Sequence, residues 1–152
     1  MKAILIAVIV ILSLMATPGD CFFFKKSSHN YVDGSFNFLK GSHNGIRGNK
    51  NFVLGNNNGI IGNHNGIIGS NNGVIGHFNG VAGNGNFVKG SLNGVVGHGN
   101  GVQGVLNGVV GNGNYVKGAI NGVIGHGNGV QGGLNFVKGN HNHVRGFGNF
   151  LI

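Results

Sequence analysis

Residues 93–106 read NGVVGHG followed by NGVQGVL, and this seven-residue pattern decides the fold. An Asn recurs at every seventh residue from Asn30 to Asn149, and an apolar residue follows each Asn two positions later. A Gly stands four positions after each Asn, as far as Gly146. Three constant positions at a fixed period indicate one small unit stacked many times, rather than a globular domain with a pocket.

Within each repeat, the Asn, apolar and Gly positions (1, 3 and 5) alternate with two variable positions, as in a five-residue strand with one buried face. Positions 6 and 7 hold Gly, Asn, His or Ser in most repeats, which is turn chemistry. Asn-Gly at positions 1 and 2 would favour hairpins. However, an aromatic residue replaces that Gly in seven repeats, and bulky residues tolerate a positive φ poorly. Position 2 therefore behaves as an outward strand position, which favours a solenoid.

The predicted fold is an all-β solenoid, or β-roll, over residues 30–152. Two heptads make each 14-residue coil, and about nine coils form two parallel sheets. The apolar rows meet in a core one residue wide, while stacked Asn amides satisfy one another and the turn backbone along the inner corners. The Gly at position 5 leaves room opposite them. The predicted ladder includes Asn58, Asn65, Asn72, Asn79, Asn86, Asn93, Asn100, Asn107, Asn114 and Asn121.

The consensus x-x-Asn-x-Val-x-Gly, as in Asn93-Gly-Val95-Val-Gly97, resembles the repeat of the ice-recrystallisation-inhibition (antifreeze) proteins of grasses. More loosely, it resembles the head repeats of bacterial trimeric adhesins. The resemblance to the plant family covers nearly all of residues 30–152 and implies a β-roll with a Val core and internal Asn ladders. Ice-binding faces in that family are rich in Thr and Ser, whereas this chain has Gly, Phe, Tyr, Val, Ile, Lys and Gln at the outward positions. The resemblance therefore supports the fold better than the function.

Alternate repeats predict two unlike faces. The basic face is dotted with aromatic residues, for example Tyr115 beside Lys117. The apolar face has a straight stripe beside a floor of glycines, with Phe residues at both ends. Exposed apolar strips usually mark a partner surface, although drift on a tolerant scaffold would also produce one. The candidate surface-binding residues are Leu54, Ile68, Ala82, Val96, Val110 and Ile124 in the stripe, and Gly66, Gly80, Gly94, Gly108 and Gly122 in the floor.

The partner predicted for this face is a second copy of the chain, in a structural, self-associating protein. The alternatives are a flat repetitive surface such as ice, chitin or another polymer, which includes an ice-binding function. A third possibility is an anionic membrane, as for a cationic Gly-rich antimicrobial protein. The formal net charge is +8, which favours anionic partners or simply keeps copies apart. Nucleic acid is disfavoured because the longest basic run is Lys25-Lys26.

The N-terminus predicts a secreted, extracellular protein. Residues 1–19 combine Lys2, an apolar stretch too short for a membrane span and small residues near Gly19, as in a secretory signal peptide. Residues 20–29 form an aromatic and basic segment expected to cap the solenoid. Cys21 is the only cysteine, so it links two chains, stays a free thiol or is lost with the signal peptide.

Catalysis is not expected. Two acidic residues and one Cys provide neither a carboxylate pair nor a Ser-His-Asp set, and a one-residue-wide core leaves no room for a cleft. The His residues fit turns better than a metal site, because His98 and His126 fall two coils apart at one corner, roughly 9.5 Å from each other. The sequence thus predicts a non-enzymatic protein with no cofactor or bound metal.

Overall fold

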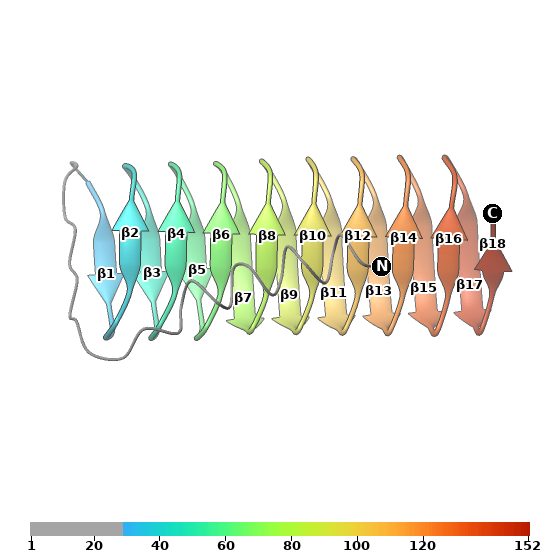
Figure 1. Cartoon of the computed structure of the whole chain (residues 1–152), viewed down its shortest axis with the longest axis horizontal. Coiled ribbons are helices and arrows are strands. Elements are labelled where there is room, and N and C mark those ends of the chain that lie inside the picture. The colour runs from blue at the N-terminus through green and yellow to red at the C-terminus, as the bar shows by residue number, and fades with distance from the viewer. Residues whose placement is uncertain (1–28) are drawn as a thin grey trace.

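The computed structural model describes residues 29–152, which form one solenoid (Figure 1). The predicted signal peptide over residues 1–19, Cys21 and all but the last residue of the predicted cap over residues 20–29 lie outside the described residues. Within residues 29–152 every regular element is a strand, and no helix is long and apolar enough to cross a membrane.

The strands form two nine-stranded sheets, one on each side of the coil (Figure 1). The first sheet contains β1 (Tyr31–Asp33), β3 (Gly45–Arg47), β5 (Gly59–Ile61), β7 (Gly73–His77), β9 (Phe87–Ser91), β11 (Gly101–Val105), β13 (Tyr115–Ala119), β15 (Gly129–Gly133) and β17 (His143–Phe147). The second contains β2 (Phe38–Lys40), β4 (Phe52–Leu54), β6 (Gly66–Ile68), β8 (Gly80–Ala82), β10 (Gly94–Val96), β12 (Gly108–Val110), β14 (Gly122–Ile124), β16 (Phe136–Lys138) and β18 (Phe150–Leu151).

Every neighbouring pair of strands is parallel, with partners 14 residues apart, as in Val95 and Val109. Two heptads therefore make one coil, and the predicted β-solenoid with two parallel sheets and about nine coils is confirmed. The core is a single row of apolar side chains from each sheet. Its fully buried members include Ile46, Val53, Ile60, Ile67, Val74, Val81, Val88, Val95, Val102, Val109, Val116, Val123, Val130 and Val137.

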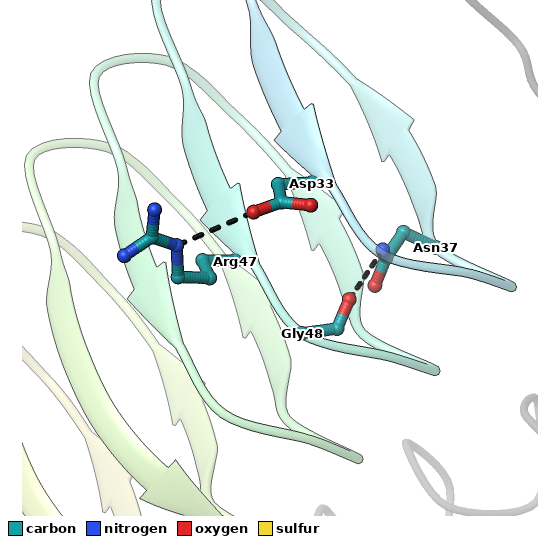
Figure 2. Close-up of polar contacts among 4 residues, drawn as sticks. All are labelled: Asp33, Asn37, Arg47 and Gly48. Carbon is teal, nitrogen blue, oxygen red and sulfur yellow. Dashed lines mark hydrogen bonds and ion pairs between the residues drawn. The ribbon is translucent and has the colours of Figure 1, made fainter.

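The predicted asparagine ladder is also confirmed, and Asn93 shows its unit. Its Nδ2 donates to Asn79 Oδ1 at 3.0 Å in the preceding coil and to the Gly104 carbonyl at 2.9 Å. Its Oδ1 accepts from the backbone N–H of Asn107 at 3.1 Å and from Asn107 Nδ2 at 3.0 Å. Figure 2 shows the corner bond of Asn37, whose Nδ2 donates to the Gly48 carbonyl at 2.7 Å. In the part of the chain that the structure describes, no buried polar side-chain atom lacks a partner.

The position-5 glycines explain why no strand runs from Asn to Gly as predicted. Their φ angles lie between 116 and 140°, a region that other residues rarely adopt, so the chain bends there. Most strands therefore cover only positions 2 to 4, while β7 and the later strands of the first sheet continue through the bend to position 6. A Cβ atom on Gly97 would also overlap the Gly111 carbonyl oxygen of the next coil. Room for the Asn ladder is thus only part of the reason for glycine.

Candidate functional site

The apolar face lies on the second sheet, and its stripe is as straight as predicted. Parallel pairing brings position 4 of each strand beside position 4 of the next, for example Val96 beside Ala82 and Val110. Ile68 is 41 % exposed, and Leu54, Ala82, Val96, Val110 and Ile124 are half-buried. The structure therefore places the stripe residues in one row on the surface.

The glycine floor runs beside this stripe at position 2. Gly66, Gly80 and Gly94 are buried, and Gly108 and Gly122 are half-buried. Stacked rings lie in the same row at both ends. The Phe38 and Phe52 ring centroids are 4.9 Å apart, and those of Phe136 and Phe150 are 5.2 Å apart. The floor is therefore a bounded apolar strip without side chains of its own.

A third apolar row, which sequence reasoning missed, borders the floor. We call it the corner ridge: it occupies position 7 at the corner that leads from the first sheet to the second. Its side chains are 42 to 52 % exposed, and their backbone φ angles lie between 55 and 59°. The ridge comprises Phe78, Leu92, Leu106, Ile120 and Leu134.

The position-2 glycines are more buried on the second sheet, beside the ridge, than on the first sheet. Position 7 of one repeat lies two residues before position 2 of the next, so Leu92 precedes Gly94 at the edge of the second sheet. On the first sheet the equivalent glycines follow small or polar turn residues, and none of them is buried; Gly59 is exposed. The ridge, floor and stripe together form a continuous apolar surface.

The opposite corner makes the same turn without large apolar side chains at position 7. There, Gly85, Gly99, Gly113 and Gly127 occupy position 7 with φ angles of 62 to 65°, which glycine adopts without strain. Position 6 of this corner carries a second, solvent-exposed ladder. The His98 N–H donates to Asn112 Oδ1 at 2.8 Å.

His98 and His126 lie in the turns of this corner, as predicted. The Asn84 N–H donates to His98 Nδ1, and the Asn112 N–H donates to His126 Nδ1, both at 3.1 Å. Both rings therefore use Nδ1 as an acceptor for the turn backbone. Among residues 29–152 no group of three or more His, Cys, Asp or Glu side chains lies close enough together to hold a metal ion.

The surroundings of His64 perturb its titration. Its ring stacks on Phe78, with centroids 4.7 Å apart. Desolvation lowers the pKa of His64 below 6.5, and the nearby charges of Lys50 and His77 lower it further. The neutral ring is therefore favoured at the start of the corner ridge.

The basic face lies on the first sheet and carries its rings and cations in alternate coils. Phe87 and Lys89 are on β9, Tyr115 and Lys117 are on β13, and glycine and glutamine take the same positions on the strand between them. At the other end of this sheet, Arg47 Nε lies 3.3 Å from Asp33 Oδ2 (Figure 2).

No family model, curated protein or solved structure matches this chain.

Proposed function

We propose that this protein is a secreted, non-enzymatic structural protein that self-associates through its apolar face. The contact surface consists of the corner ridge, the glycine floor and the stripe. In a two-fold pair each copy would present the same surface, and the ridge of one copy would lie over the floor of the other.

The observation that carries this proposal is the strained backbone of the corner ridge. A left-handed conformation costs a residue other than glycine roughly 1–2 kcal/mol, and a β-branched residue such as Ile120 adopts it only rarely. Opposite the ridge, the same turn is made with glycine from Gly85 to Gly127 and with His or Asn in the other coils, never with a large apolar residue. Because the ridge side chains are about half exposed, their burial within one copy does not offset the energy of this backbone strain. Burial of the ridge side chains against a second copy would offset the strain.

The area of the apolar face sets the expected strength of self-association. The stripe from Leu54 to Ile124 is about 24 Å long, and the distance from ridge to stripe is about 13 Å, which gives an area on the order of 300 Å² per copy. Stable dimers bury roughly 800 Å² per partner. The association is therefore expected to be weak and to depend on protein concentration.

Sedimentation velocity over a wide concentration range tests the proposal. The natural protein should associate as its concentration rises, whereas Val96→Lys with Val110→Lys should remain monomeric with an unchanged circular-dichroism spectrum. The matched control is Gln103→Lys with Gln131→Lys, which adds the same charge on the basic face and should associate like the natural protein. A natural protein that stays monomeric at high concentration, or equal association of both variants, would refute the proposal.

Ice is the second candidate partner for this face, because the stripe residues recur in register at the coil spacing and present a flat, regular row. The row contains Leu, Ile, Ala and Val instead of Thr. An ice-recrystallisation assay separates the two proposals. Inhibition by the natural protein that is lost with Val96→Lys and Val110→Lys would assign the face to ice, and no inhibition would leave the second copy as its partner.

A further inference from the structure

The basic face repeats its chemistry every second coil. A ring at position 2 and a cation at position 4 occur together on β9, β13 and β17, while β11 and β15 between them carry Gly and Gln. Parallel pairing keeps these residues in two straight rows. The ring and cation pairs are Phe87 with Lys89, Tyr115 with Lys117, and His143 with Arg145.

Each ring leans back over the glycine of the preceding coil. A Cβ atom built on Gly101 would lie 3.2 Å from Tyr115 Cδ2, and one built on Gly73 would lie 3.3 Å from Phe87 Cδ2. Because glycine separates the rings, they do not cover one another as the stacked rings of the apolar face do. Phe87 is 52 % exposed and Tyr115 is 56 % exposed, so each keeps an open apolar surface.

The cations of this face have no acidic neighbour on their own sheet from β9 to β17. Lys89, Lys117 and Arg145 are exposed, and every other outward residue of these strands is neutral or a His. The one acidic residue among residues 29–152, Asp33, lies at the far end beside Arg47. The C-terminal half of the basic face is therefore a row of uncompensated positive charges, which favours an anionic ligand.

The period of the row identifies the class of ligand. Two coils span about 9.6 Å, which is close to the length of one disaccharide in an extended glycan. We infer that this face binds a linear polysaccharide that carries one carboxylate or sulfate per disaccharide. The C–H faces of alternate sugars pack on Phe87 and Tyr115, their anionic groups meet Lys89, Lys117 and Arg145, and the Gln side chains between them bond hydroxyl groups.

Two observations favour a glycan with this period. Each strand of a DNA duplex carries a charge about every 3.4 Å, far more often than the cations recur on this face. Residues 84–111 and 112–139 are near copies, which accounts for two of the three pairs. His143 and Arg145 lie outside the copied stretch, yet they again place a ring beside a cation with different residues. The chemistry therefore recurs where the sequence itself does not.

Binding of hyaluronan oligosaccharides, which have one carboxylate per disaccharide, tests this inference. The distance from β9 to β17 is about 19 Å, so among chains of whole disaccharides a hexasaccharide is the shortest that reaches all three cations. The affinity measured by calorimetry at low salt should rise steeply up to the hexasaccharide and only weakly beyond it. Failure of hyaluronan to bind would overturn the inference.

Three variants locate the site. Lys89→Gln with Lys117→Gln should weaken binding by about fivefold. Tyr115→Gly should weaken it by about fivefold and still fold, because glycine occupies the same position in the adjacent coils. Lys40→Gln with Lys138→Gln removes the same charge from the opposite sheet and should bind like the natural protein. An equal loss in this control would show attraction by net charge alone, and tighter binding of oligothymidylate of equal charge would assign the face to nucleic acid; either result overturns the inference.

Discussion

The carbonyl oxygen of Gly125 lies where Gly111, in the preceding coil, would carry a Cβ atom. The same contact joins successive position-5 glycines along both sheets, and each of these glycines has a φ angle between 116 and 140°. Close backbone packing between coils therefore depends on the absence of a side chain at this position.

Gly111→Ala should consequently destabilise the protein by about 3 kcal/mol or more, because it combines backbone strain with a steric overlap. Chemical denaturation monitored by circular dichroism measures this loss. Gly59→Ala is the control: a Cβ atom there meets nothing within 4 Å, so a small change or a gain of about 0.5 kcal/mol is expected. Equal losses in the two variants would contradict this account of the position-5 glycines.

The internal asparagines should be far more important for stability than the exposed ones. Asn93→Ala removes the bonds that Asn93 makes to the Gly104 carbonyl and to the backbone N–H of Asn107, at a cost of about 1–3 kcal/mol for each unsatisfied group. Asn107 Nδ2 loses one of its two acceptors and keeps the Gly118 carbonyl. Asn84 accepts a bond from the Ser70 N–H in an exposed turn, where water can replace it, so Asn84→Ala should cost about 1 kcal/mol or less. The two unfolding curves provide the comparison, and similar midpoints would argue against the ladder as the main polar support.

The corner ridge should contribute to association and not to folding. In Leu106→Asn with Ile120→Asn, the relief of left-handed strain and the loss of half-buried apolar contact nearly cancel. The free energy of unfolding should therefore change by no more than about 1 kcal/mol per residue. Sedimentation should show weaker self-association, whereas Gly99→Asn with Gly113→Asn at the opposite corner should associate normally. A large loss of stability in the ridge variant would instead make the ridge a structural element.

His64 should make stability weakly dependent on pH. Its folded pKa is lowered, mainly by desolvation and then by Lys50 and His77, so the unfolded chain binds its proton more readily. The contribution of His64 to stability is therefore complete above pH 6.5 and decreases as the pH falls toward the folded pKa. An NMR titration of the ring should give a midpoint below 6.5, and Lys50→Gln should raise it. A midpoint at or above 6.5 would be inconsistent with the stacked, partly desolvated ring.

The sequence alone predicted the parts of the molecule that repeat without exception. Asn, an apolar residue and Gly at constant positions led directly to the ladder, the core and the 14-residue coil, and alternation of the heptads led to the stripe and the basic face. The strand bounds were wrong, because the strands begin after the Asn, and most of them end before the position-5 glycine while six strands of the first sheet continue through it. The close contact between position-5 glycines of successive coils was also missed, because the pattern within one heptad does not contain it.

The corner ridge was missed for a different reason. The rule that bulky residues avoid positive φ correctly placed Phe52 in a strand, because its φ is not positive. The same rule does not predict the conformation of Leu92 and Ile120, which adopt positive φ against their local preference. The available signal was weak: large apolar residues recur every 14 residues among turn positions that otherwise favour Gly, Asn or His. Local propensity fails at this corner because its exposed apolar side chains offer no compensating burial within one copy.

The bonds of each asparagine reach only the coils directly before and after it, so the coils are interchangeable units of the solenoid. Residues 84–111 and 112–139 are near copies of 28 residues, or two coils, each. Insertion or deletion of such a unit would lengthen or shorten the solenoid and would keep the residue rows of both faces in register. Unequal recombination within the gene can therefore tune the reach and valency of the molecule in discrete steps, without any new side-chain chemistry having to evolve.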